Sequence, residues 1–351
     1  MLYAWWTQYN AGEVMWRPAA ATETTIRPGL LRPRFCNYTP AFVIALAPFA
    51  RLDQKTAYWL WQGLQLLCVA IAVVLLARGA DPPLTLEATL VVLALTVISR
   101  PLRGTVTYAQ LSPMLLALLV AAWFFARREH SVLAGLTLAA AALLKLYPAA
   151  AGGYFLFGRR WRALGWTIVF FVLGLAASGI GNWIAFAQFG MSGTMGAIHR
   201  GNLTTLAFYQ DVIGGGSANW LVYALTATDD LLLIAIAARP TSRNTRIGGP
   251  SGGIAFSLWL GAAILMSPLA WPHETLLLLP LYLSVFLAAR EAPNRNATTG
   301  WPFVTAVAIV AACALAELIK LLPAPGFPAL FVTLLAASLV ASVEPSPEFA
   351  G

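Results

Sequence analysis

The chain has 351 residues, of which 59% are hydrophobic and only 10% are charged, and its mean hydropathy is +0.73. A soluble core of this size cannot bury so much apolar surface, so the composition excludes a soluble globular protein and predicts a polytopic membrane protein. The net charge of +8 would favour nucleic-acid binding in a soluble protein. Here most of the excess is arginine in short loops between apolar stretches, which indicates membrane topology. We expect membrane lipid around the protein and no nucleic-acid partner.

The cysteines give no sign of a cross-linked or metal-bound protein. Cys36, Cys68 and Cys313 form no closely spaced pair, and the last two lie inside apolar stretches. This usage predicts neither a disulfide framework nor a metal cluster, and we expect no cofactor.

Apolar runs long enough to cross a hydrocarbon layer of about 30 Å follow one another along the chain. They lie at residues 56–77, 84–99, 111–126, 163–181, 219–238, 253–269, 274–289, 302–320 and 327–343. These runs predict an all-α transmembrane bundle over residues 56–343. An extracytoplasmic segment with an interfacial helix is expected in residues 1–55, and a cytoplasmic tail in residues 344–351.

Residues 131–158 do not fit the pattern of a single crossing. Arg127–Arg128 precede this stretch and the run RRWR at 159–162 follows it, so both ends favour the same membrane face. One helix of that length, at about 1.5 Å per residue, would overshoot the bilayer, and a proline and a glycine pair interrupt it. We predict a re-entrant helical hairpin with Lys145–Pro148 at its apex.

The distribution of cations predicts the orientation, because short cytoplasmic loops carry an excess of Lys and Arg. The arginines expected on the cytoplasmic side are Arg78, Arg127, Arg128, Arg159, Arg160, Arg162, Arg239, Arg243, Arg246, Arg290 and Arg295. The opposite loops after residue 56 hold only Arg100, Arg103, Arg200 and Lys320. Short outer loops are therefore expected at 100–110, 182–218, 268–273 and 321–326.

Few ionisable residues interrupt the apolar runs, and each has a functional and a structural interpretation. Lys145 at the hairpin apex suggests function, although its ammonium group could instead reach the interface. His273 follows a proline at a predicted helix start, either in a site or in an interfacial aromatic belt. For Glu274 we favour a first-turn carboxylate that complements the helix dipole. For Asp229–Asp230, in mid-span, we favour a structural hydrogen-bonding pair.

Polar side chains that suit a binding site are concentrated in the predicted outer segments. One outer loop combines Arg200, Asn202 and Asp211. Gln110 ends another, and Tyr38 precedes a short apolar segment. Each signal alone is weak, because polar loops are commonly only solvated, but all of them lie on one predicted face.

Several of these residues lie in short motifs that occur in the same order in a known family. The strings FCNYTPAF, YAQLSP, LLKLYP, RGNLTT and SPLAWPHETLLLLP, within a similarity from about residue 35 to 290, resemble glycosyltransferase family 87. Leu144–Pro148 matches a motif of that family fully, and Ser267–His273 matches its Ser-Pro-x-x-Trp-x-His motif. Ala109 replaces a glycine, and Leu203 replaces an amide residue.

The resemblance implies a GT-C-like helix bundle in the bacterial plasma membrane whose active site faces outside. It implies inverting transfer of a hexose, mannose foremost, from a polyprenyl-phosphate donor to a lipid or glycan acceptor. His273 and Lys145 would then be catalytic, with Asp211 as an outer carboxylate that could serve as base away from any motif position. Substrate-binding roles are expected for Tyr38, Gln110, Tyr147, Arg200, Asn202 and Trp271.

One departure from the family concerns the start of the chain. In the family, a first transmembrane helix precedes an aspartate that resembles the catalytic base, and here that aspartate would fall at or before Met1. We expect either an upstream segment that carries both or an inactive, truncated family member. A transporter or flippase with Lys145 and Asp229–Asp230 as a charge path is the alternative from another class, although no inverted repeat is evident.

Overall fold

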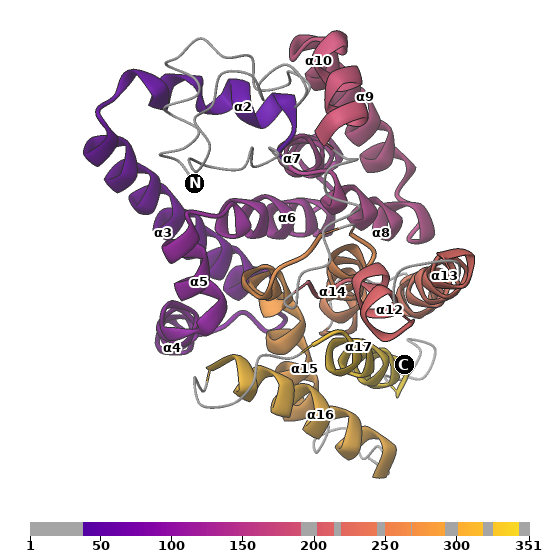
Figure 1. Ribbon diagram of the computed structural model, residues 1–351. Helices are drawn as coiled ribbons and strands as arrows, with labels where there is room; N and C mark the ends of the chain where they lie inside the picture. Colours follow the sequence, from indigo (N-terminus) through magenta and orange to yellow (C-terminus); the bar gives the residue numbers. More distant parts are fainter. Residues whose placement is uncertain are drawn as a thin grey trace.

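The computed structural model describes residues 38–190, 202–213, 219–243, 250–267, 269–291, 301–318 and 326–343. Within these ranges every regular element is a helix and no strand occurs (Figure 1). The expectation of an all-α protein is confirmed. The interpretations that concern residues 1–37 fall outside the described residues, and so does the expectation of a helix and an aspartate at or before Met1.

The helices follow one another along the chain with short breaks. In order they are α2 (Pro40–Leu46), η2 (Ala47–Arg51), α3 (Gln54–Gly79), α4 (Leu86–Ile98), α5 (Arg100–Tyr108), α6 (Ser112–Arg127), α7 (Ser131–Leu144), η3 (Tyr147–Ala151), α8 (Gly152–Phe157), α9 (Trp161–Ala177), α10 (Ile180–Ala185), η4 (Phe186–Gly190), α12 (Thr205–Ile213), α13 (Asn219–Arg243), α14 (Pro250–Leu265), η5 (Pro272–Leu278), α15 (Leu279–Glu291), α16 (Trp301–Leu318) and α17 (Phe327–Val343).

Three described helices are long and apolar enough to cross a membrane: Gln54–Gly79, Trp220–Ser242 and Pro272–Arg290. Two bent pairs raise this number to five, with angles of 55° between α4 and α5 and 96° between α9 and the helix that follows it. The other predicted runs form shorter apolar helices. The chain is therefore an all-α polytopic membrane protein, as its composition predicts.

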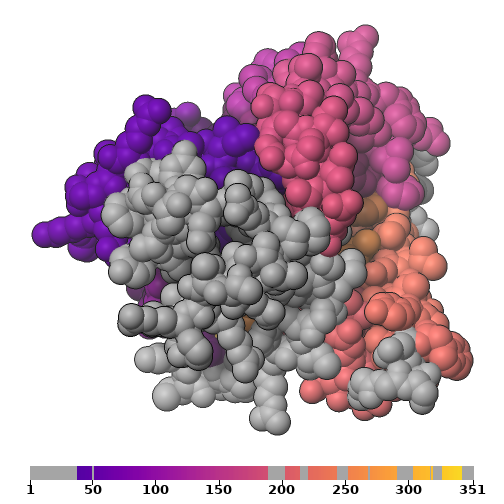
Figure 2. Space-filling view, turned by 45° about the horizontal axis from the view of Figure 1, so that its top comes forward, coloured from indigo at the N-terminus to yellow at the C-terminus, as the bar shows by residue number. Residues whose placement is uncertain are grey.

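Large apolar side chains face outward on several helices. Trp59 on α3 is 64% exposed and Leu173 on α9 is 58% exposed. Figure 2 shows α3 in indigo and α9 in pink toward opposite sides of one face of the molecule. Exposed apolar surface of this extent is expected where a helix contacts lipid rather than water.

The prediction that residues 100–110 form a loop is wrong, because most of this stretch is the helix α5. The Ser99 hydroxyl accepts a hydrogen bond from the Leu102 amide at 3.4 Å, and Pro101 occupies the first turn. A serine cap followed by proline is a helix-start signal. The helix ends at Ala109, whose φ of 50° lies in the left-handed region.

The stretch at 131–158 breaks where the sequence predicts an apex. Helix α7 ends at Lys145, whose backbone is extended, and two short helices, η3 and α8, lead the chain back. At the opposite end the Arg160 guanidinium donates a hydrogen bond to the Ala126 carbonyl at 2.7 Å. The two arginine-rich flanks thus meet, as a re-entrant hairpin requires.

Close helix packing holds this hairpin in the bundle. At Gly135 on α7, an added Cβ would lie 2.6 Å from the Trp166 Cβ of α9, so only glycine allows this approach. In Figure 1, α6 crosses the centre of the molecule between α3 and the hairpin. Small residues at such crossings bring helix backbones together, which substitutes for hydrophobic driving force inside a membrane.

Candidate active site

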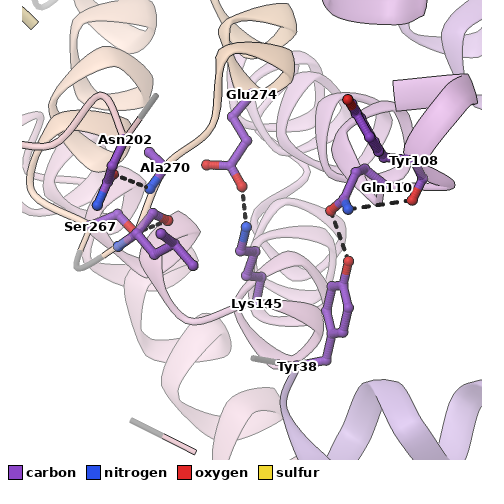
Figure 3. A network of polar contacts seen from close by, with 9 residues as sticks. Tyr38, Tyr108, Gln110, Lys145, Asn202, Ser267, Ala270 and Glu274 are labelled. Carbon is purple, nitrogen blue, oxygen red and sulfur yellow. Dashed lines mark hydrogen bonds and ion pairs between the residues drawn. The ribbon is translucent and has the colours of Figure 1, made fainter. Parts of the chain in front are cut away.

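The apex of the hairpin carries a buried pair of opposite charges. The Lys145 ammonium forms an ion pair with Oε1 of Glu274, which lies 129 positions later in the chain (Figure 3). The side chain of Glu274 is 1% exposed and that of Lys145 is 16% exposed. Charges this deeply buried remain ionised only when they are paired. The pair therefore joins the hairpin to the segment that starts at Pro272.

The local sequence explains why Lys145 projects from the end of a helix. Pro148 has no amide hydrogen and cannot continue α7, so the last carbonyls of the helix lose their usual donors. The Thr39 hydroxyl donates hydrogen bonds to the carbonyls of Leu143 and Leu144, the latter at 3.3 Å. Thr39 also caps its own helix by accepting from the Phe42 amide. This contact places Tyr38 beside the apex.

Tyr38 in turn contacts the turn between α5 and α6. Its hydroxyl donates a hydrogen bond to Oε1 of Gln110 at 2.8 Å (Figure 3). Gln110 follows Ala109, whose backbone is left-handed, and the backbone amide of Gln110 donates a hydrogen bond to the Thr105 carbonyl at 3.0 Å. The reversal at Ala109 turns the Gln110 side chain toward Tyr38.

A short helix with 3-10 geometry presents His273 and Glu274. Pro272 begins η5, the Glu274 amide donates to the Trp271 carbonyl at 2.8 Å, and the Thr275 hydroxyl donates to the Pro272 carbonyl at 2.7 Å. His273 is 8% exposed, and its ring centroid lies 6.3 Å from that of Tyr108. One backbone and one side-chain hydrogen bond thus hold the first turn of η5 in place.

The segment before η5 is held by the segment at residue 202. Oδ1 of Asn202 accepts a hydrogen bond from the Ala270 amide at 2.9 Å, and the Leu203 amide donates to the Ala270 carbonyl at 2.8 Å. Asn202 therefore bonds directly to the residue that precedes Trp271. Figure 3 shows this contact on one side of the charge pair and Tyr38 with Gln110 on the other.

We call Tyr38, Gln110, Lys145, His273 and Glu274 the apex cluster. Several buried polar atoms in and around it have no hydrogen-bond partner among the described residues. They are Thr105 Oγ1, Tyr147 Oη, His273 Nε2 and Glu274 Oε2. The Lys145 ammonium also lies 4.9 Å from the centroid of the Tyr147 ring. Buried polar atoms are normally paired, so this arrangement suits a ligand that both donates and accepts hydrogen bonds.

One predicted catalytic residue is not part of this arrangement. Asp211 is exposed on α12, and no hydrogen bond or ion pair connects it to the apex cluster within the described ranges. Arg200 lies outside the described residues. Tyr147 and Trp271 adjoin the cluster, the first beneath Lys145 and the second as the residue before η5.

The two mid-span aspartates contact a different element. Oδ2 of Asp229 accepts a hydrogen bond from the Tyr209 hydroxyl at 2.7 Å, and Oδ1 of Asp230 accepts from the Thr205 hydroxyl at 3.0 Å. Both donors belong to α12. These contacts agree with the structural interpretation of the pair, and Lys145 uses Glu274 as its partner instead.

Glu274 is the site residue whose importance the sequence interpretation missed. Its position in the first turn favours a helix-dipole carboxylate, which would be solvated, whereas the side chain is 1% exposed and bound to Lys145. The string ETLLLLP carries a signal, because an acidic residue beside so apolar a run requires a partner, and Lys145 is an intramembrane cation that can provide it. The sequence interpretation also gives no role to Thr39, the neighbour of Tyr38, although its hydroxyl bonds to the end of α7.

Among the described residues no group of three or more His, Cys, Asp or Glu side chains is arranged to hold a metal ion.

Comparisons with known proteins match more than half of the chain. A curated relative from Mycolicibacterium smegmatis, described as a polyprenol-phosphate-mannose-dependent alpha-(1-2)-phosphatidylinositol pentamannoside mannosyltransferase, is 28% identical over 223 residues, which are 59% of this chain and 50% of the relative. The chain thus spans about half the length of the curated relative it matches. No solved structure matches it. The family profile matches residues 35–268. The chain belongs to glycosyltransferase family 87.

Proposed function

We propose that this membrane glycosyltransferase moves a hexose, and specifically mannose, from a polyprenyl-phosphate donor to a lipid or glycan acceptor. The observation that carries the proposal is the apex cluster, in which a cation and a histidine lie beside buried hydrogen-bonding groups that have no partner among the described residues. The cation and the histidine come from separate motifs that resemble those of the family. The relative's described dependence on polyprenol-phosphate-mannose favours mannose and this class of donor.

The chemistry assigned to the cluster is a single displacement at the anomeric carbon. An acceptor oxygen forms a bond to that carbon while the bond between the carbon and the donor phosphate oxygen breaks, which inverts the centre. The electron pair leaves on the phosphate, and the acceptor proton passes to a base. Lys145 suits stabilisation of the departing phosphate, and His273 lies next to the carboxylate that holds Lys145.

The base and the sugar contacts are assigned from side-chain chemistry. Asp211 is the proposed base, because its carboxylate is exposed on α12 close in sequence to Asn202. Hydroxyl, amide and ring groups that suit sugar hydroxyls are proposed at Tyr38, Gln110, Tyr147, Asn202 and Trp271. Arg200 is proposed as a further phosphate contact.

The lipid part of the donor accounts for a site inside a membrane protein. Exposed apolar helices provide the surface along which a polyprenyl chain can lie. The excess of arginines on one predicted side supports an active site on the outer face of the bacterial cell membrane. Substrate and product then exchange directly with the bilayer.

A transfer assay tests the function. Purified protein in nanodiscs is supplied with polyprenyl-phosphate-[14C]mannose and a mannosylated lipid acceptor, and labelled product is measured. We expect transfer by the wild type and loss of transfer in His273→Ala with the helical circular dichroism unchanged. His130→Ala is the matched control, because His130 is exposed and precedes the first residue of α7, at the end opposite Lys145.

The transporter alternative predicts a different outcome. It requires a charge path through Asp229 and Asp230, yet these residues bond to Tyr209 and Thr205. Movement of donor across the membrane of a sealed vesicle without covalent transfer would refute the proposed function. Full transfer by His273→Ala would remove His273 from the site.

A further inference from the structure

We propose that Glu274 is a positioning residue that competes with the donor phosphate for Lys145 and thereby promotes release of the polyprenyl-phosphate product. This inference rests on the proposed function and assigns a role to a residue outside the family motif. Lys145 would alternate between two anionic partners: the Glu274 carboxylate when no lipid phosphate is present, and the phosphate when it is.

The contacts of the pair give the first argument. Oε1 of Glu274 is bound to Lys145, while Oε2 of the same carboxylate is buried and has no partner among the described residues. A purely structural carboxylate at 1% exposure would be expected to use both oxygens, because each unpaired buried acceptor is costly. The Trp271 backbone also stabilises the Glu274 carboxylate. Glu274 can therefore give up Lys145 while one contact of its carboxylate remains.

The second argument is that another hydrogen-bond donor lies beside Lys145. The Tyr147 hydroxyl is buried and has no hydrogen-bond partner among the described residues. The Tyr147 ring lies beneath the Lys145 ammonium at 4.9 Å, and the charge of Glu274 acts on the phenol. A phenol donates a hydrogen bond readily to a carboxylate. When Lys145 turns to a phosphate, Tyr147 can supply the hydrogen bond that Glu274 loses.

The third argument comes from the charges of substrate and product. The donor is a phosphodiester with one negative charge. Breakage of the sugar–phosphate bond leaves the electron pair on oxygen, so the product is a phosphomonoester whose charge at pH 7 is about −1.5 to −2. A buried carboxylate beside Lys145 repels the product more strongly than the donor. Its presence therefore weakens product binding selectively.

Measurement of two affinities tests this role. The dissociation constants of polyprenyl phosphate and polyprenyl-phosphate-mannose are measured for purified protein without acceptor, in wild type and in Glu274→Gln. Both ligands should bind the variant more tightly, and the product should gain about tenfold more than the donor, as expected for one additional charge near a buried anion. In turnover, kcat should fall while the KM for donor also falls, because product release becomes slower.

Asp81→Asn is the matched control, since it also removes one carboxylate that pairs with a cation, in this case Arg127 at 3.5 Å and away from the hairpin apex. That variant should leave both affinities unchanged. Should Glu274→Gln fail to fold, Glu274→Asp is measured instead, because a carboxylate withdrawn from Lys145 should shift the ratio in the same direction by a smaller factor.

An equal change in both affinities, or no change, would overturn the role of Glu274. The affinities do not depend on turnover, so this outcome is separate from failure of the proposed function. A wild-type protein that transfers no mannose refutes the function, whereas an active wild type with an unchanged affinity ratio refutes only the inference.

Discussion

Replacement of Lys145 by methionine should strongly destabilise the protein. Replacement of Glu274 by methionine in the same chain should restore most of the lost stability. In Lys145→Met the Glu274 carboxylate stays at 1% exposure without its cation. Removal of one partner of a buried pair costs about 3–5 kcal/mol, because an uncompensated charge remains in a medium of low polarity. Glu274→Met should cost a similar amount. The double variant replaces both charges with apolar chains of similar length and should be nearly as stable as the wild type.

The free energy of unfolding of the four proteins is measured by denaturant titration in detergent, with tryptophan fluorescence as the signal. The pair of Asp81 and Arg127 serves as the control, since its carboxylate is 60% exposed, whereas that of Glu274 is 1% exposed, and pairs with a solvated partner contribute about 0–1 kcal/mol. If the double variant is no more stable than the single ones, the two charges are not coupled and the ion pair is not what fixes the apex. Transfer activity should be lost in every variant that lacks Lys145.

Two further predictions concern packing and pH. Gly153→Ala should destabilise the protein by about 1–3 kcal/mol, because the added Cβ would overlap the Trp259 ring, whereas Gly165→Ala meets nothing within 4 Å and should stabilise α9 by about 0.5–1 kcal/mol. Thermal unfolding measures the stability of both variants, and an equal change in the two would contradict this packing. Burial, followed by the hydrogen bond to Asp229, raises the pKa of Tyr209 from 10.0 to about 12. The stability contributed by its neutral hydroxyl is complete below pH 10 and is lost as pH rises toward about 12. The stability advantage over Tyr209→Phe should therefore shrink across that window, and an advantage that stays constant would contradict the assignment.

The sequence was most informative where charge lies next to apolar residues. Arginines on both flanks of residues 131–158 predicted a hairpin, and the hydrogen bond from Arg160 to the Ala126 carbonyl joins those flanks. The same argument located Lys145 at the apex. Composition and hydropathy predicted the all-α membrane fold, because insertion in lipid leaves helices as the main way to satisfy backbone groups.

Sequence reasoning failed where a residue's role depends on a distant partner. A carboxylate in the first turn of a helix has the same sequence pattern whether it is solvated or pairs with a cation 129 positions away, as Glu274 does. The contact of Thr39 with the Leu143 carbonyl is equally nonlocal. The helix α5 is a different failure: its start signal at Ser99 and Pro101 is local, but its polar composition favoured the interpretation as a loop.

Three chain breaks coincide at the apex cluster, and this coincidence explains why so many polar groups gather there. Helix α7 ends at Lys145, α5 ends at Ala109 and η5 begins at Pro272. Backbone groups freed by such breaks need partners inside a membrane protein, and irregular backbone is tolerated at that depth only within protein or beside a polar cavity. Thr39 supplies such partners at one break. These breaks therefore create a polar site among apolar helices. A conservative substitution such as Glu274→Gln leaves the breaks in place, so it tests the chemistry of the site more cleanly than a truncation does.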